Sequence, residues 1–137
     1  MKQIGYELTG PIGARATLGL VVLQADETLE QDFRRLFPDR GIAIYTSRIA
    51  SGDELSTGSI AAMEAELARG AGLLPRAARF DAVAYGCTSG TTLIGADAVA
   101  GMLRQGVETP VVTDPLTAAL AALEALQVKR LGLGTPY

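Results

Sequence analysis

Short runs of apolar residues alternate along the chain with longer segments whose apolar side chains recur every three or four residues. The apolar runs predict β-strands at about residues 17–23, 42–46, 80–87, 110–113 and 128–134. The amphipathic segments predict α-helices at about residues 26–37, 56–74, 95–104 and 115–126. The first strand run is apolar almost throughout, which is typical of a strand that is buried on both faces.

Strict alternation of buried strands with helices predicts a parallel sheet joined by right-handed crossovers. We therefore expect an α/β protein of three layers (αβα) with a parallel, flavodoxin-like sheet of strand order 2-1-3-4-5. Residues 1–16 form a lead segment punctuated by Gly and Pro, and residues 17–137 form the α/β domain. Ligands of such sheets bind beyond the carboxyl ends of the strands, close to the first strand. The loops after the first, third and fifth strands are therefore the candidate sites.

The composition limits the possible partners. The 137 residues fit one domain, and 12 Lys and Arg against 15 Asp and Glu give a formal net charge of −3 and a pI near 4.9. This balance offers no basic surface for nucleic acid or for an acidic membrane. The start of the chain has no secretory apolar region, and no run approaches the roughly 18 apolar residues of a membrane span. We expect a cytoplasmic protein, with which an unpaired Cys agrees.

The chain contains no His and a single Cys. A Ser-His-Asp triad, a Cys-His pair, an internal disulfide and a zinc site of imidazole or thiolate ligands are therefore excluded. Any metal would need carboxylate and carbonyl ligands. The chemistry that remains uses the thiol, hydroxyls, carboxylates, amines, guanidinium groups or the backbone.

The single cysteine, Cys87, stands where the third strand gives way to a helix, and Thr88, Ser89 and Gly90 follow it. A helix N-terminus presents unpaired N–H groups and the positive end of the helix dipole, which favour a thiolate and attract a carboxylate. One loop can thus offer both a nucleophile and a cradle for a small carboxylic acid. The alternative is a cysteine that only packs, because free Cys is among the most buried residue types. The residue pattern leaves both interpretations open.

Other loop chemistries fit the sequence less well. Residues 86–90 place the serine one position too late for a G-x-S-x-G nucleophile elbow, and a Walker A loop and a G-x-G-x-x-G fingerprint are absent. A phosphoacceptor receiver domain needs Asp at the end of the third strand, where this chain has Cys87. Asp26 and Glu27 after the first strand would repel the phosphate of a flavin cofactor.

Three segments together resemble the aspartate/glutamate racemase superfamily: LGLVVLQADETLE at 18–30, AYGCTSGT at 84–91 and LGLGTPY at 131–137. Within it, the chain is most similar to the branch of maleate cis-trans isomerase, arylmalonate decarboxylase and the ectoine-utilisation racemase-like proteins. The match extends from about residue 17 to the last residue, and Cys-Thr-Ser-Gly in this context is a fairly specific motif.

The resemblance implies two pseudo-symmetric α/β halves with the active site between them, each half giving one cysteine in the isomerases and racemases. Cys87 matches the first of these and is implied to act as nucleophile or as acid and base. Thr88 and Ser89 match the loop that holds a substrate carboxylate, and Tyr137 matches a tyrosine that hydrogen-bonds it. The decarboxylase branch carries Gly in place of Cys87, so the resemblance favours an isomerase or racemase. Neither reaction needs a cofactor or a metal.

Asp26 departs from the family pattern, because the isomerases commonly carry an Asn there that grips a carboxylate. An acid would repel a dicarboxylate such as maleate unless it were protonated or bridged. A substrate with an amino or amide nitrogen, such as an ectoine derivative, suits Asp26 better. Considered without the family, Asp26 fits the N-cap of its helix, which is the plainer role.

We therefore expect a cofactor-independent isomerase, like maleate cis-trans isomerase, that acts on a small carboxylic acid through Cys87. The alternatives are a racemase for an amino acid or an ectoine derivative, and a carboxylate-binding domain without turnover. Because the superfamily continues beyond the fifth strand, we expect this sequence to be the first half of a larger protein. A domain that ends there would leave an apolar sheet face bare, which also favours a fragment. The alternative is a half-site that completes itself by association, and we expect a homodimer or higher homo-oligomer.

Overall fold

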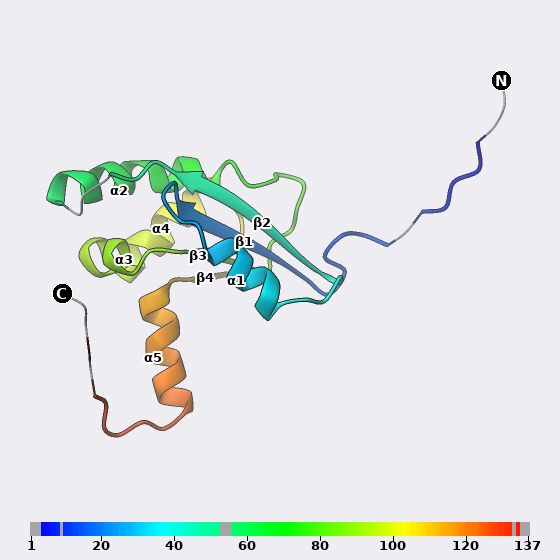
Figure 1. Ribbon diagram of the computed structural model, residues 1–137. Coiled ribbons are helices and arrows are strands. Elements are labelled where there is room, and N and C mark those ends of the chain that lie inside the picture. Colours follow the sequence, from blue (N-terminus) through cyan, green and yellow to red (C-terminus); the bar gives the residue numbers. More distant parts are fainter. Residues whose placement is uncertain (1–3, 9, 53–55, 133, 135–137) are drawn as a thin grey trace.

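The computed structural model describes residues 4–8, 10–52, 56–132 and 134, and these contain four strands and five helices (Figure 1). Along the chain they are β1 (Ala16–Leu23), α1 (Leu29–Leu36), β2 (Ile42–Ile49), α2 (Thr57–Ala71), β3 (Ala82–Tyr85), α3 (Thr88–Ile94), α4 (Ala96–Gly106), β4 (Val111–Thr113) and α5 (Pro115–Ala125). The four strands lie where the apolar runs predicted them.

All four strands are parallel, and they lie in the order β2-β1-β3-β4. In central β1, Leu18 is paired with Ile44 of β2 on one side and with Ala82 of β3 on the other. The strand directions and order confirm the predicted α/β fold and the first four strands of the flavodoxin-like arrangement. Because β1 and β3 are neighbours, the loops that follow them begin side by side at one edge of the sheet.

Different helices cover the two faces of the sheet. Successive side chains of a strand point to opposite faces. Gly70 of α2 lies against Val21, whereas Leu29 of α1 and Val22 both lie against Gly86. Helices α1 and α2 therefore lie on opposite faces, which gives the predicted αβα layers (Figure 1).

The core lies between the sheet and helices α2 and α4, which pack against each other. Its fully buried side chains include Val21, Leu67, Val83, Tyr85, Val99 and Leu103. Each such aliphatic side chain contributes about 1.5–3 kcal/mol by its burial. The helices are short, so their stability comes mainly from this packing and less from intrinsic helix propensity. The packing thereby holds the carboxyl edge of the sheet in place.

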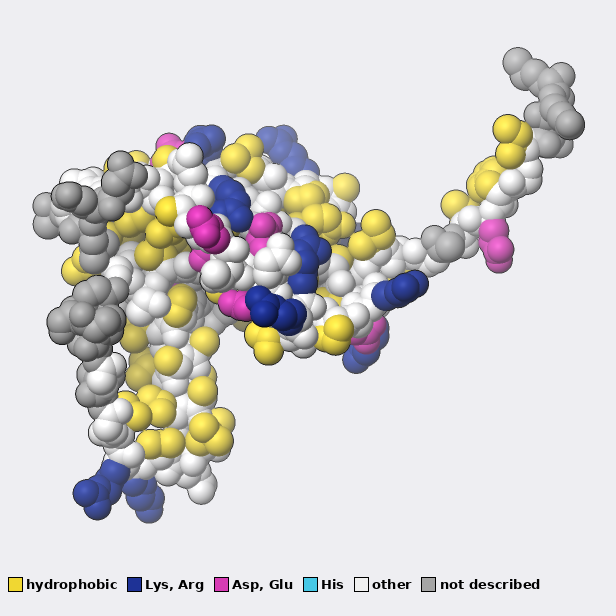
Figure 2. All heavy atoms as spheres, viewed as in Figure 1, with side chains coloured by type: hydrophobic (Ala, Val, Ile, Leu, Met, Phe, Trp, Pro, Cys, Tyr) yellow, Lys and Arg dark blue, Asp and Glu magenta, His cyan; other side chains and the backbone are white. Residues whose placement is uncertain are grey.

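Helix α5 stands apart from this core. It contacts α3 but has no buried residue, and it runs away from the sheet (Figure 1). Hydrophobic side chains are visible along its length in Figure 2, and Leu120 on it is 60% exposed. Although α5 is apolar, no helix among the described residues is both long and apolar enough to cross a membrane.

The fifth strand, predicted at residues 128–134, does not form in the described part of that segment, residues 128–132 and 134. Gln127 after α5 has a positive φ of 53°, and Val128 and Leu131 are exposed. A strand needs a neighbouring backbone to pair with. Because α5 leads the chain away from the β4 edge, this apolar run finds no strand partner among the described residues, and the prediction of a fifth strand was wrong here.

The sequence predicted a strand-to-helix transition at Cys87 and a helix over residues 95–104. The structure forms two helices here, α3 directly after Cys87 and α4 from Ala96, with Gly95 as the junction between them. Gly95 has a φ of 97°, which side-chain-bearing residues rarely adopt. The turn from α3 into α4 therefore depends on this glycine.

Candidate active site

Cys87 lies at the carboxyl edge of the sheet, two residues after β3 ends, and is the N-cap of α3. Its Sγ accepts a hydrogen bond from the backbone N–H of Gly90 at 3.2 Å. Its carbonyl oxygen accepts from the N–H of Thr91 at 3.0 Å and from the Thr91 hydroxyl at 2.8 Å. Hydrogen bonds thus fix both the backbone carbonyl and the side chain of Cys87, and the sulfur faces the first turn of α3.

Cys87 is also part of the hydrophobic core. It is 9% exposed and belongs to the buried cluster between the sheet and helices α2 and α4. This burial is what a packing cysteine would show, whereas the Gly90 N–H donating to its sulfur is what a nucleophile site would show. The geometry therefore accommodates both interpretations of the sequence.

Tyr85 is a second polar group beside Cys87, and the sequence analysis missed it. Its side chain is fully buried, and its hydroxyl has no hydrogen-bond partner among the described residues. Burial first, and then the acidic Cys87 thiol close by, raise the pKa of Tyr85 well above its ordinary value of 10. The alternation of side chains along a strand places Tyr85 and Cys87 on one face, and this signal was present in the sequence.

Gly90 allows the tyrosine and the cysteine to share this space. A Cβ on Gly90 would lie 2.6 Å from the Tyr85 hydroxyl oxygen and 3.1 Å from the Cys87 Sγ. Both distances are shorter than ordinary van der Waals contact, so only glycine fits without displacing one of the two groups. The phenol hydroxyl, the sulfur and the Gly90 N–H therefore converge at one point.

Thr88 and Ser89 form the first turn of α3 directly after Cys87, as predicted. Thr88 is exposed and Ser89 is half-buried. The first amides of a helix have no acceptor within the helix and are suited to an anion, and the first turn of α3 carries no acidic residue. The carboxylate-binding role of both residues remains a prediction.

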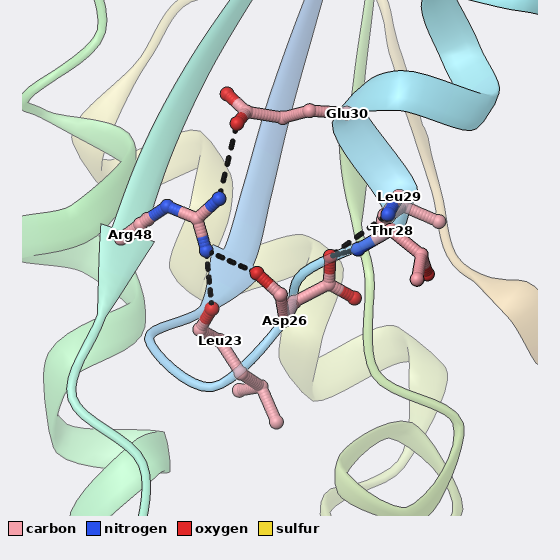
Figure 3. Close-up of polar contacts among 6 residues, drawn as sticks. All are labelled: Leu23, Asp26, Thr28, Leu29, Glu30 and Arg48. Atoms are coloured by element: carbon pink, nitrogen blue, oxygen red, sulfur yellow. Dashed lines mark hydrogen bonds and ion pairs between the residues drawn. The ribbon is translucent and has the colours of Figure 1, made fainter.

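Asp26 has a structural role in the loop after β1. Its Oδ1 accepts hydrogen bonds from the N–H of Thr28 at 3.1 Å and of Leu29 at 2.8 Å, which closes the turn into α1 (Figure 3). The residue at the N-cap position is Thr28, which makes no side-chain capping bond, so Asp26 supplies the cap from two residues earlier. Its predicted contact with a substrate remains a prediction.

Arg48 at the end of β2 ties this loop to the sheet. Its guanidinium donates to the carbonyl oxygens of Leu23 at 3.0 Å and Asp26 at 2.7 Å, and it pairs with Glu30 at 3.0 Å (Figure 3). The nearby Thr46 hydroxyl, and to a smaller extent Arg48, hold the pKa of Glu30 below its ordinary value of 4.5. Burial acts in the opposite direction. Leu29, at the start of α1, in turn contacts Gly86, so the loop after β1 is held beside the residues that precede Cys87.

Tyr137 lies outside the described residues, so its predicted role is not tested. Asp114 is the N-cap of α5: its carboxylate accepts from the N–H of Thr117 at 2.9 Å and from the Thr117 hydroxyl at 2.6 Å. Helix capping accounts for this buried acid.

A cavity of about 890 Å³ opens at the opposite edge of the sheet, away from Cys87. It lies between the segments that precede β3 and β4, residues 72–80 and 106–110. Ligands of parallel α/β sheets bind at the carboxyl edge instead, so its position does not match the expected site. Among the residues described, no cluster of three or more Asp, Glu or Cys side chains is placed to hold a metal ion.

Comparison with known proteins identifies the fold. No family model matches the sequence, and no curated protein matches it. The structure is similar to a maleate cis-trans isomerase from Nocardia farcinica bound to TRIS, with a TM-score of 0.66, 24% sequence identity, and coverage of 82% of this chain and 49% of that one. It is also similar to the maleate isomerase Iso from Pseudomonas putida S16, with a TM-score of 0.68, 25% identity, and coverage of 89% and 54%.

The chain thus matches about half the length of both isomerases. At this level of identity the comparison establishes the architecture: four parallel strands in the order β2-β1-β3-β4 with helices on both faces. The chain therefore shares the α/β fold found within two maleate isomerases.

Proposed function

We propose that this chain belongs to the aspartate/glutamate racemase superfamily and supplies a cysteine-bearing half of a cofactor-independent isomerase site. The substrate is a small unsaturated carboxylic acid of the maleate type. Asp26, which would repel it as a free acid, accepts the N–H groups of Thr28 and Leu29, and these partly offset its charge. One observation carries the proposal: in a fold shared with two maleate isomerases, Cys87 lies at the carboxyl edge of β3 and its sulfur accepts the Gly90 N–H at 3.2 Å. A second α/β half, in the same polypeptide or in a second copy, completes the site.

In the proposed reaction, the Cys87 thiolate adds to one carbon of the substrate double bond. The π-electron pair moves to the neighbouring carbon and is delocalised into the carboxylate attached to it. Backbone amides of the first turn of α3, with the hydroxyls of Thr88 and Ser89, stabilise that carboxylate. The central bond, now single, rotates, and the electron pair re-forms the double bond as the thiolate leaves. No proton or electron is gained or lost overall.

Intact-mass spectrometry after incubation with maleate tests this step. The addition needs only Cys87, and a proton from water at the neighbouring carbon traps the product as a stable thioether. We expect a mass increase equal to one molecule of maleic acid in the wild type and none in Cys87→Ala. Any conversion to fumarate, followed by proton NMR, should fall in Cys87→Ala to the uncatalysed background.

The matched control is the double variant Cys87→Ala/Thr92→Cys, which moves the single thiol to an exposed position one turn further along α3. Because Cys87 is buried, adduct formation at an equal or higher rate in this variant would mean that the surroundings of Cys87 give it no special reactivity, and it would overturn the proposal. In deuterated water, exchange at the α-carbon of an amino acid without isomerisation of maleate would instead favour the racemase. Carboxylate binding without any adduct would favour a binding domain.

A further inference from the structure

Tyr85 places an unpartnered hydroxyl inside the core next to the sulfur of the single cysteine. The Tyr85 side chain is 0% exposed, and its hydroxyl has no hydrogen-bond partner among the described residues. Both this oxygen and the Cys87 Sγ lie within about 3 Å of the point where a Cβ on Gly90 would be. The hydroxyl is thus directed at the space that the sulfur faces.

We propose that Tyr85 is a positioning residue for Cys87: its hydroxyl donates a hydrogen bond to the sulfur once the thiol ionises, and it holds the thiolate toward the substrate together with the Gly90 N–H. This inference rests on the proposed function and names a further residue of the same site. Tyr85 acts through Cys87 and does not itself contact the substrate.

The unpartnered Tyr85 hydroxyl destabilises the core while Cys87 is a neutral thiol. A buried donor without an acceptor costs about 1–3 kcal/mol, whereas a phenylalanine of nearly the same shape would avoid that cost. A thiolate is a much better acceptor than a neutral thiol, because hydrogen bonds to charged groups are stronger. The penalty that Tyr85 carries beside the thiol is therefore relieved when Cys87 becomes charged, and this difference favours the thiolate.

Tyr85 can serve as a donor throughout the range in which a cysteine ionises. Burial first, and then Cys87, raise its pKa above the ordinary value of 10, so the phenol keeps its proton. This direction agrees with the geometry: two acidic groups so close together cannot both ionise easily.

Unlike Tyr85, the charged side chains on the elements around α3 are exposed, paired with each other or engaged in helix caps. Helices α2, α4 and α5 all contact α3. On them, the exposed charged residues include Glu64, Asp97, Arg104 and Glu124, and Glu66 pairs with Arg69. At the carboxyl edge of the sheet, Asp26 and Asp114 accept hydrogen bonds from the first turns of their own helices. Within the part of the chain that the structure describes, Tyr85 is thus the titratable group that shares the buried space of Cys87.

The pH dependence of alkylation of the native chain tests the proposal, because the chain has one thiol and the assay needs no turnover. In Tyr85→Phe we expect the midpoint of the rate-against-pH curve for iodoacetamide to move upward by about one pH unit, as loss of a hydrogen bond to a charged group predicts. The matched control is Tyr45→Phe, which removes a phenol hydroxyl from another tyrosine packed against the same core. Its curve should coincide with that of the wild type.

A purely structural tyrosine would give a different result. If the Tyr85→Phe curve coincides with the wild type while the variant is equally or more stable to heat, the inference is overturned. If Tyr85→Phe does not fold, fluorine NMR of the wild type labelled with 3-fluorotyrosine decides. One of the four tyrosine signals should then shift with the same midpoint as alkylation and lose that shift in Cys87→Ala. The two proposals can fail separately. If no maleate adduct forms but Tyr85→Phe still shifts the alkylation midpoint, the proposed function is rejected and the contact between Tyr85 and Cys87 stands.

Discussion

Two glycines shape the corner between β3 and α3. A Cβ on Gly86 would collide with the Leu29 side chain, and one on Gly90 would crowd the Tyr85 hydroxyl and the Cys87 sulfur. The first glycine lets the loop after β1 approach the corner, and the second lets the phenol and the thiol face the same helix turn. At the scale of residues, the environment of Cys87 is thus set as much by missing side chains as by those present.

Gly90→Ala tests this crowding. We expect it to lower the free energy of unfolding by about 1–3 kcal/mol, because the new methyl forces a shift of Tyr85 or Cys87 in a packed core. Thermal and urea unfolding measure the change. The matched control is Gly101→Ala on an exposed position of α4, where a Cβ meets no atom within 4 Å. That variant should gain about 0.5–1 kcal/mol from helix propensity alone. A gain of similar size in Gly90→Ala would contradict the crowding.

At the scale of elements, Arg48 joins three pieces of the fold. It is the next-to-last residue of β2, donates to backbone carbonyls of the turn after β1, and pairs with Glu30 in α1. Figure 3 shows the guanidinium between Glu30 and the turn that contains Leu23 and Asp26. The arrangement fixes where α1 starts and so where Leu29 meets the corner at Gly86.

The acid sensitivity of this junction follows from the sign of the shift. The pKa of Glu30 lies below its ordinary value of 4.5, so its carboxylate stabilises the fold above that pH, and the contribution is lost as the pH falls through the lowered value. Glu30→Gln should therefore lower the melting temperature near neutral pH and make little difference near pH 3. Differential scanning calorimetry at several pH values measures this convergence. Glu64→Gln on the exposed face of α2 is the control, and an equal pH-dependent effect there would refute the assignment to Glu30.

At the scale of the whole molecule, one core accounts for the fold and α5 contributes little to it. The sheet, α2 and α4 enclose the buried side chains, whereas α5 contacts α3 and has no buried residue. Its apolar side chains lie open in Figure 2. Exposed apolar surfaces of this kind are typical of association sites. The predicted homo-oligomer remains a proposal, as does the second half of the active site.

Substituting one leucine in α4 and one in α5 compares how much each helix contributes to the stability of the fold. Leu103 in α4 is fully buried and Leu120 in α5 is 60% exposed. Leu103→Ala should lower the free energy of unfolding by about 2–5 kcal/mol, because it leaves a cavity in the core. Leu120→Ala should change it by less than about 0.5 kcal/mol. Urea denaturation of both variants measures the difference, and a comparable loss in Leu120→Ala would mean that α5 is packed in solution.

Much of the candidate site could be predicted from the sequence because its signals are local. The hydrophobic pattern located the strands, and the strand-to-helix transition placed Cys87, Thr88 and Ser89 on one turn. The capping role of Asp114 was also evident from the Pro that follows it. The relation between Tyr85 and Cys87 follows from strand alternation too, but their shared access to Gly90 depends on how α3 packs.

The sequence by itself determined the first four strands, their parallel direction and the position of the cysteine, because hydrophobic periodicity and helix caps act over a few residues. Only the tertiary structure decided which of these elements found partners. Residues 128–132 have the composition of a strand but no neighbouring backbone, and α5 is a helix without a core. The burial of Cys87 and the unpartnered Tyr85 hydroxyl were likewise decided by packing, because burial depends on residues that are distant along the chain.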